Sequence, residues 1–279
     1  MTQPNTLDLF KLDGRVAVVT GGAGLLGAEF CYSLAQAGAS IVVADIHEEK
    51  AAELAHSISA SGRKALAIQV DVTQPASVQR MVSSTVEAFG SLDILVNSAV
   101  LDPKFDPQHE QSNRQGHPGE FESYPLRAWD EAISVNLTGA FLSSQAAVIP
   151  MLEQGHGVIV NISSIYGLVG PDQRLYQRPN QPPQYKPVYY SVTKAGILGL
   201  TKYLATYYAG KNIRVNCLTP GGVFNQHDEE FLQAYSSRTV LGRMARKDEM
   251  NAAMLFLVSE ASPYMTGANL VVDGGWPAW

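Results

Sequence analysis

The feature that most constrains this chain is a regular alternation of short β-branched runs with longer, alanine-rich helical segments. Seven runs indicate strands, at residues 16–20, 41–45, 65–69, 93–96, 158–162, 213–217 and 269–273. The segments between them predict helices near 25–37, 48–60, 75–89, 126–152, 188–209 and 247–259. Strands that alternate with helices form a parallel sheet covered by helices. We therefore expect an α/β fold, a doubly wound seven-stranded parallel sheet with helices on both faces.

Length and composition bound the domain organisation and the partners. The chain has 279 residues, of which 46% are hydrophobic, and the predicted elements use its whole length, so we expect residues 1–279 to form a single domain. It has 20 basic against 26 acidic side chains, a formal net charge of −6. This balance lacks the basic excess that binds nucleic acid or an anionic membrane surface, so neither is an expected partner.

Targeting and cysteine patterns indicate a reducing compartment. Apolar runs such as 16–19 and 41–44 fall far short of the roughly 20 residues that cross a bilayer. The first residues have no basic segment leading into an apolar run, so no export signal is visible. Cys31 and Cys217 are the only cysteines, which supports neither a disulfide framework nor a metal cluster. We expect a cytoplasmic protein without a metal site.

A glycine-rich turn follows the first predicted strand. The residues from Thr20 to Gly27 read TGGAGLLG and lead directly into an apolar helix. The glycines at 22, 24 and 27 match the dinucleotide fingerprint of a Rossmann-type fold in its strand–turn–helix context. Glycine lets the backbone turn tightly and approach a pyrophosphate, which the positive end of the helix dipole favours. We expect the cofactor to contact Gly21, Gly22, Gly24, Leu25, Leu26 and Gly27.

Asp45 ends the second predicted strand, 18 residues after Gly27. A carboxylate there accepts hydrogen bonds from both ribose hydroxyls of NAD and repels the 2′-phosphate of NADP. Neither Arg nor Lys stands beside it, because Ile46 and His47 follow. The sequence therefore favours NAD over NADP, with Asp45 and Ile46 as cofactor contacts. In the alternative interpretation, Asp45 only caps the following helix.

A Tyr with a Lys four residues later is the candidate catalytic pair. Both side chains lie on one helical face, where an ammonium can lower the pKa of a phenol from about 10. The chain has two such pairs, Tyr190/Lys194 and Tyr207/Lys211. Ligands of an open parallel sheet bind at the carboxyl ends of the strands, where each following helix begins. Tyr190 lies in the first turn of its predicted helix and Tyr207 about 25 Å further along the axis. We therefore favour Tyr190 and interpret Tyr207 as a surface or core aromatic residue.

With these motifs in order, the chain resembles the short-chain dehydrogenase/reductase family, in its single-domain subclass, over essentially its whole length. The resemblance rests on Thr20-Gly21 with the glycine turn, Asp71-Val72, Asn97-Ser98-Ala99, Asn136, Asn161 to Ser164, Tyr190 to Lys194, Pro220-Gly221 and Gly267 to Gly275. It implies a catalytic tetrad of Asn136, Ser164, Tyr190 and Lys194. It also implies cofactor contacts at Asp71, Val72, Asn97, Ser98, Ala99, Tyr190, Lys194, Pro220, Gly221 and Val223, with Asn97 also steadying the central strands.

The resemblance further implies a role for each member of the tetrad. Tyr190 takes the proton from a substrate hydroxyl while hydride leaves the same carbon for nicotinamide, and it returns the proton in reduction. Ser164 hydrogen-bonds the reacting oxygen. Lys194 binds the nicotinamide ribose and lowers the pKa of Tyr190, and Asn136 supports a water that relays protons to the lysine. Ser163 and Ser164 face opposite sides of a strand, so we expect Ser164 in the cleft and Ser163 in a packing role.

The chain departs from the subclass in its turn and in its connecting segments. Leu25 stands where the turn usually has its middle glycine, and Val100 and Asn225 replace a usual Gly and Thr. Segments 99–125 and 165–187 are longer than usual and carry Lys104, His109, Arg114, His117, Arg174, Tyr176, Arg178, Tyr185 and Lys186. Because both segments follow carboxyl ends of strands, we expect them to form one lid over a polar substrate. The alternative is that these proline-rich segments are only solvated.

These observations predict an NAD(H)-dependent oxidoreductase that interconverts a secondary alcohol and a ketone. The expected substrate is polar, with sugar-derived and nucleotide-sugar compounds as candidates, and Tyr190 is the general acid/base. One alternative is a reductase of 3-oxoacyl or other apolar carbonyls. Another, from a different class, is an inactive dinucleotide-binding sensor or scaffold.

A homo-oligomer, tetramer or dimer, is also expected. The apolar last strand and the Trp276 to Trp279 tail suit a symmetric interface, and the family is commonly tetrameric. The alternative is that the tail covers its own subunit.

Overall fold

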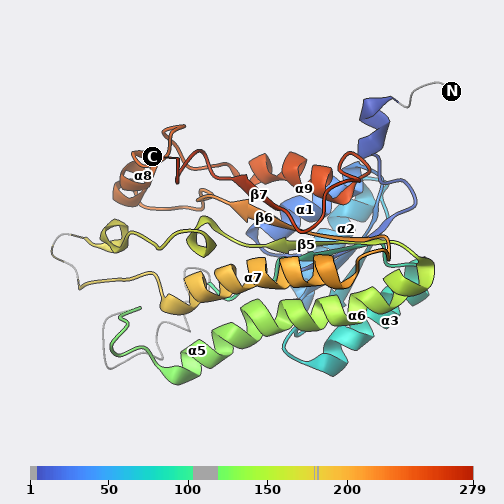
Figure 1. The fold of residues 1–279 in the computed structure, drawn as a ribbon, viewed down its shortest axis with the longest axis horizontal. Coiled ribbons are helices and arrows are strands. Elements are labelled where there is room, and N and C mark those ends of the chain that lie inside the picture. Colours follow the sequence, from blue (N-terminus) through green and yellow to red (C-terminus); the bar gives the residue numbers. More distant parts are fainter. Residues whose placement is uncertain (1–4, 103–118, 179, 181, 279) are drawn as a thin grey trace.

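The computed structural model describes residues 5–102, 119–178, 180 and 182–278. Its centre is a parallel sheet of seven strands in the order β3-β2-β1-β4-β5-β6-β7, which confirms the predicted fold (Figure 1). The strands are β1 (Val16–Thr20), β2 (Ser40–Asp45), β3 (Ala65–Gln69), β4 (Ile94–Asn97), β5 (Gly157–Ile162), β6 (Ile213–Pro220) and β7 (Asn269–Val272). β1 pairs with both β2 and β4, so the direction of winding reverses beside β1. A reversal of this kind opens a crevice at the carboxyl ends of the strands.

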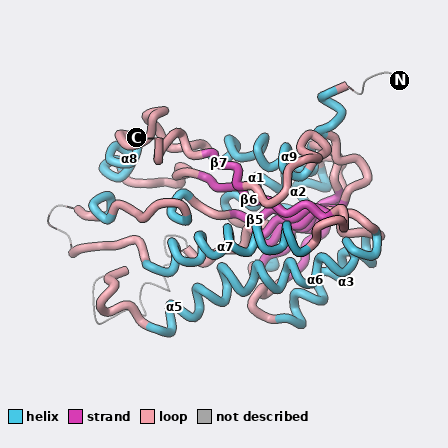
Figure 2. Tube along the Cα trace, viewed as in Figure 1, coloured by secondary structure: helices cyan, strands magenta, loops and turns pink. Residues whose placement is uncertain are grey.

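Successive side chains of the central strands enter two separate cores. In β2, Ile41 and Val43 join one cluster, and Val42 and Ala44 join the other. Helices α1 (Leu25–Gln36), α2 (Glu48–Ala60) and α9 (Asn251–Val258) cover the first face, and α3 (Pro75–Phe89), α6 (Gly139–Gln154) and α7 (Val188–Tyr207) cover the second (Figure 2). Strands buried on both faces read as continuous β-branched runs, which explains the sequence pattern.

The predicted helix over 126–152 is divided in the structure. It consists of α5 (Leu126–Ile133), a π-helical turn over Ser134–Thr138 and α6. The buried Asn136 lies in this turn, and its side-chain amide bonds the backbone N–H and C=O of Leu101. Gly139, at the end of this turn, lies close to Val72, because a Cβ on Gly139 would be only 2.6 Å from the Val72 side chain. The π turn therefore fits the helix to the segments that follow β3 and β4.

Other boundaries also differ from the expectation. The segment 219–246 contains a helix, α8 (Glu229–Ser236), whose first turn is capped by the Asp228 side chain. The last predicted helix begins as a 3-10 turn over Lys247–Met250 before α9. β6 continues to Pro220 because it pairs with β7 along that extension.

The continuous helical run Leu126–Gln154 is long and apolar enough to cross a membrane by length and composition, with a mean hydropathy of 1.4. In the structure, 50% of its apolar window is buried, and α6 packs on α3, β4 and β5. These are the contacts of a core helix. A core helix can be as long and as apolar as a membrane-spanning helix. Uninterrupted apolar runs do not reveal this segment, because polar residues interrupt it throughout.

Candidate active site

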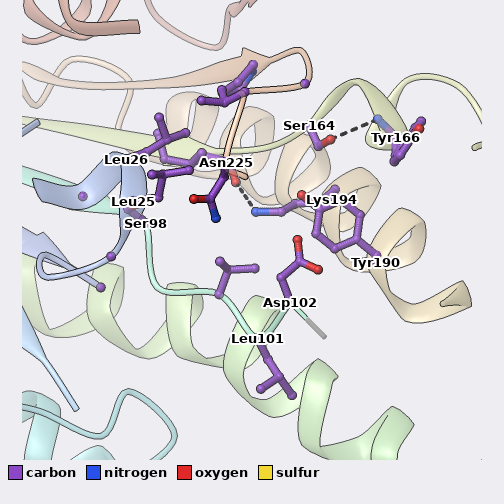
Figure 3. Close-up of a pocket in the computed structure, with 18 of the residues that line it drawn as sticks. Leu25, Leu26, Ser98, Leu101, Asp102, Ser164, Tyr166, Tyr190, Lys194 and Asn225 are labelled. Atoms are coloured by element: carbon purple, nitrogen blue, oxygen red, sulfur yellow. Dashed lines mark hydrogen bonds between the residues drawn. The ribbon is translucent and has the colours of Figure 1, made fainter. Parts of the chain in front are cut away.

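A cleft of about 1510 Å³ opens at the carboxyl ends of the strands (Figure 3). Most of the predicted cofactor contacts line it: Gly21, Gly24, Leu25, Leu26, Gly27, Asp45, Ile46, Asp71, Val72, Ser98, Ala99, Tyr190, Lys194, Pro220, Gly221 and Val223. Gly22 and Asn97 are not among the lining residues. Gly22 donates its N–H to Ala44 O at 3.1 Å and packs against β1 and β2.

The glycine turn forms a tight cradle at the start of α1. Gly21 has a φ of +64°, and a Cβ at this position would lie 2.7 Å from Ala99 Cα. A Cβ on Gly27 would collide with the Gly21 carbonyl oxygen. Gly24 is the N-cap of α1, so the N–H groups of the first helical turn, starting at Leu25, have no intrahelical acceptor. The cradle fits a pyrophosphate, because these N–H groups and the helix dipole favour an anion.

Asp45 connects the two turns that border this cradle. Its carboxylate accepts from the Ala23 N–H and from the His47 N–H, both at 3.0 Å. Helix α2 has His47 as its N-cap and no side-chain cap, so the capping interpretation of Asp45 is wrong. Lys50 from α2 also lines the cleft. The sequence did not indicate it, because Lys50 does not follow Asp45 directly and lies in the first turn of the next helix.

Asn97 has a structural environment. Its side-chain amide is buried and donates to Asn161 Oδ1 at 2.8 Å and to Ser144 Oγ at 2.9 Å. Asn161 in turn donates to Thr201 Oγ1 at 2.9 Å. This network joins β4 and β5 to α6 and α7, so the side chain of Asn97 steadies the central strands rather than facing the cleft.

Tyr190, Lys194 and Ser164 converge in the cleft from two elements. Tyr190 and Lys194 lie one turn apart at the start of α7, and Ser164 follows β5. The Ser164 hydroxyl accepts from the Tyr166 N–H at 3.2 Å and lies near enough to the Tyr190 phenol to lower its pKa. Lys194 Nζ donates to Ile162 O at 2.9 Å and lies 5.8 Å from the centroid of the Tyr190 ring. Figure 3 shows all three side chains on one side of the cleft.

Burial is the largest influence on the pKa values of Tyr190 and Lys194. It raises the pKa of Tyr190, as does the nearby Asp102 carboxylate, whereas the Ser164 hydroxyl lowers it. Burial also lowers the pKa of Lys194 to about 8. The net shift in the pKa of Tyr190 is therefore upward, opposite to the lowering by Lys194 that the sequence predicts, because desolvation disfavours the charged phenolate.

Ser163 and Asn136 hold the backbone around the reactive groups. The buried Ser163 donates its hydroxyl to Lys194 O at 2.8 Å, which ties the end of β5 to α7. Asn136 contacts Leu101 and Thr193 and does not line the cleft. The Asn136 side chain thus connects the segment after β4 to α7.

Tyr207 lies at the other end of α7, as expected from its position in the sequence. Its side chain is exposed and stacks on Tyr203, with ring centroids 5.7 Å apart. It does not line the cleft. The second Tyr/Lys pair is therefore a surface feature.

Described residues of the long segments also line the cleft. Tyr176, Arg178, Tyr185 and Lys186 line it. Arg174 instead forms an exposed ion pair with Asp172 at 2.7 Å. Lys104, His109, Arg114 and His117 lie outside the described residues.

Several lining residues were missed by sequence reasoning. They are Leu101, Asp102, Ile165, Tyr166, His227, Phe231, Tyr235 and Met244. Arg178 donates to both carboxylate oxygens of Asp228 at 2.9 Å, which attaches segment 165–187 to α8. Trp276 packs on Tyr235 with ring centroids 4.2 Å apart, so this part of the tail covers its own subunit. No short motif marks these contacts, because they depend on how α8 folds over the cleft.

Metal binding finds no support in the part of the chain that the structure describes. Within it, no group of three or more His, Cys, Asp or Glu side chains could hold a metal ion.

Known proteins match this chain over nearly its full length. A family described as enoyl-(acyl carrier protein) reductase matches residues 23–277. The chain is 33% identical over 270 residues to a 2,5-dichloro-2,5-cyclohexadiene-1,4-diol dehydrogenase of Sphingobium indicum, covering 95% of this chain and 97% of the relative. It is 35% identical over 284 residues to a D-threitol dehydrogenase of Mycolicibacterium smegmatis, covering 99% of each.

A solved structure extends the likeness to three dimensions. The gluconate 5-dehydrogenase from Burkholderia cenocepacia, in complex with NADP and tartrate, superposes with a TM-score of 0.84 at 32% identity, covering 99% of this chain and 100% of that one. Together with the sheet order and the cleft, these matches identify the chain as a member of the short-chain dehydrogenase/reductase family and as an oxidoreductase that acts on CH–OH groups.

Proposed function

We propose that this protein is an NAD(H)-dependent oxidoreductase that interconverts a secondary alcohol and a ketone on a polar, hydroxylated substrate. The observation that carries the proposal is the convergence of Ser164, Tyr190 and Lys194 beside the glycine cradle. The matched dehydrogenases act on alcohols, by their names a cyclic diol, threitol and gluconate, which supports this reaction type.

The proposed mechanism assigns one role to each group in the cleft. When bound, the nicotinamide ring exchanges a hydride with the reacting carbon. Tyr190 transfers the proton of the reacting oxygen, and Ser164 donates a hydrogen bond that orients this oxygen. Lys194 binds the nicotinamide ribose and supplies a positive charge beside the phenol, which favours its ionised form. The backbone of Lys194 is held by Ser163, so the ammonium enters the cleft from a fixed point.

The long segments are proposed to act as a lid over the substrate. Support comes from Tyr176, Arg178 and Lys186, which line the cleft from segment 165–187, and from the attachment of this segment to α8. The alternative is a reductase of apolar carbonyl compounds, and the aromatic side of the cleft around Phe231 and Tyr235 suits such substrates. The ion pairs on the same side favour a polar substrate instead, because an apolar group would remove water from the remaining polar atoms of these charged side chains without replacing its hydrogen bonds.

NAD is the proposed cofactor because the Asp45 carboxylate ends β2 at the edge of the cleft. NADP is a second candidate, since Lys50 lines the same region and the Burkholderia relative is described in complex with NADP. We expect the wild type to prefer NAD⁺ over NADP⁺ by at least tenfold in kcat/KM, and Asp45→Ser to lose that preference. Lys50→Met serves as the matched variant. A wild-type preference for NADP⁺ that Lys50→Met abolishes would assign the region to a 2′-phosphate.

Replacing Tyr190 by Phe tests the reaction itself. Removing the phenol oxygen should lower kcat by roughly 10²-fold or more, because a general acid/base contributes about that much. The dissociation constant of NADH, measured by fluorescence titration, should change less than threefold. This pattern separates an enzyme from a scaffold that only binds the dinucleotide.

Tyr207→Phe is the control for this experiment, because Tyr207 is on the same helix, also has a Lys four residues later, and is exposed. It should leave both kcat and the NADH dissociation constant unchanged. Equal activity in Tyr190→Phe and Tyr207→Phe would disprove the mechanism.

Assembly into a homo-oligomer, tetramer or dimer, is proposed from the apolar surface. On α6 the side chains of Phe141, Ile149 and Leu152 are exposed, and Tyr203 and Tyr207 are exposed on α7. Monomeric proteins seldom expose apolar side chains in such numbers on neighbouring elements. Light scattering in solution gives the mass, and a monomer at micromolar concentration would contradict the proposal.

A further inference from the structure

A second lysine lies closer to the candidate catalytic phenol than Lys194 does. Lys186, four residues before Tyr190, places Nζ 3.9 Å from the centroid of the Tyr190 ring, against 5.8 Å for Lys194. The Lys186 side chain is only 13% exposed and lines the cleft. The proposed tetrad gives this ammonium no role.

The Lys186 ammonium is fixed by contacts from two long segments. It donates to the Asp102 carboxylate oxygens at 2.9 and 3.2 Å, and the Asp102 side chain is also 13% exposed. The Lys186 backbone exchanges two hydrogen bonds with the Gln173 side chain, at 2.9 and 3.2 Å. Figure 3 shows the Asp102 carboxylate directed toward Tyr190 and Lys194. The pair is therefore a built part of the cleft and not a loose surface contact.

Among the residues that the structure describes, Lys186 and Arg178 on this side of the cleft both have acidic partners. Lys186 pairs with Asp102, and Arg178 pairs with Asp228 at 2.9 Å, with Glu230 at 3.7 Å. An anionic substrate group near Lys186 would have to approach the Asp102 carboxylate, which repels it. A neutral hydroxyl can accept from the ammonium and donate to the carboxylate at the same time.

We propose that Lys186 and Asp102 form a subsite for a second, neutral hydroxyl on the carbon next to the reacting carbon. The inference rests on the proposed function, in which the Tyr190 phenol contacts the reacting oxygen. Because the ammonium stands over the same ring, a substituent of the adjacent carbon comes within its reach. The substrate is then a vicinal diol or a polyol and carries neither a phosphate nor a nucleotide at that position. The aromatic side chains of Tyr166 and Tyr176 complete the wall against its C–H groups.

Three matched cyclic alcohols test this subsite: cyclohexanol, 1,2-cyclohexanediol in its cis and trans forms, and 2-hydroxycyclohexanecarboxylate. With wild type and NAD⁺, the better diol isomer should exceed cyclohexanol at least tenfold in kcat/KM, and the carboxylate should be the poorer of the two substituted alcohols. A site built to hydrogen-bond a substrate hydroxyl discriminates strongly against an analogue that lacks it.

Lys186→Met keeps the aliphatic stem and removes the ammonium. We expect it to reduce the diol-to-cyclohexanol ratio of kcat/KM to within threefold of unity, so that the diol loses more activity than cyclohexanol does. Lys202→Met, on the exposed face of α7, is the matched control and should keep the wild-type ratio. Thermal melting of each variant checks that it is folded.

Other outcomes overturn the subsite. A carboxylate that is the best substrate, and that loses most in Lys186→Met, would assign Lys186 to an anionic group. An equal loss on all three alcohols would mean that the ammonium acts on Tyr190 and not on the substrate. If these alcohols react too slowly, their dissociation constants from Tyr190→Phe with NAD⁺ replace kcat/KM, and equal affinity for diol and cyclohexanol refutes the proposal. Turnover that persists in Tyr190→Phe would instead reject the proposed function.

Discussion

Lys194 is expected to lower the stability of the fold that positions it. Its side chain is buried, and burial lowers its pKa to about 8 from an ordinary value of 10.5. Below pH 8 the folded protein therefore carries a desolvated charge, at a cost of roughly 2–4 kcal/mol. The unfolded chain binds the proton more tightly, so this cost disappears as the pH rises from about 8 to about 10.5. Stability that depends on Lys194 thus increases with pH in this window.

Lys194→Met should raise the melting temperature at pH 7 and abolish activity. The increase should be about 3 °C or more, because roughly 2–4 °C accompanies each kcal/mol in a domain of this size, and the lost hydrogen bond to Ile162 offsets part of the gain. At pH 10 the two proteins should melt within about 1 °C of each other. Calorimetry at both values checks this, and a difference that is independent of pH would show that the charge is not penalised.

Some residues of the cleft can be identified from the sequence and others cannot. Tyr190, Lys194 and Asp45 were found because a local signal marks each one, a four-residue spacing or the end of a strand, and the structure brings all three to the cleft. The Lys186–Asp102 pair joins residues 84 positions apart and has no such signal. Lys186 could be named only as one of many polar residues in a long segment.

At the scale of elements, the strands and the long helices could be predicted because burial sets their periodicity. Short elements could not. Helix α8 has only eight residues, and the polar start of its sequence, Asp228 to Glu230, reads as a loop until the Asp228 cap and the Arg178 contact are known. The π turn at Asn136 arises from contacts with Leu101 and from the close approach of Val72 to Gly139, which are tertiary. Local helix propensity predicts neither of these tertiary contacts.

In the molecule as a whole, the two ends of the sheet differ in function. The carboxyl ends form the cleft, whereas a polar cluster around Asp93 ties the amino ends together. Asp93 accepts from the Val16 N–H at 2.9 Å, from Ser91 Oγ at 2.7 Å and from Arg15 at 3.1 Å, and it contacts His156 Nε2 at 2.7 Å. These groups precede or begin β1, β4 and β5. The cluster is therefore expected to serve stability and not catalysis.

Asp93→Asn should destabilise the protein by about 2 kcal/mol, because it leaves charged and buried donors poorly satisfied. Urea unfolding at pH 7 measures this loss, while kcat at 25 °C should stay within twofold of wild type. Glu87→Gln, an exposed change on α3, is the control and should alter neither.

The pH dependence of the same pair of proteins gives the sharper test. Burial raises the pKa of Asp93. The hydrogen bonds from Ser91, the Val16 N–H, His156 and Arg15 together lower it by more, so the net pKa lies below its ordinary value of 3.8. A carboxylate with a depressed pKa contributes its full stability above about pH 4 and loses it as the pH falls through the folded value. The gap between wild type and Asp93→Asn should therefore narrow from pH 5 toward pH 3. A gap that stays constant over this range would mean that the charge of Asp93 does not hold the amino ends of the strands together.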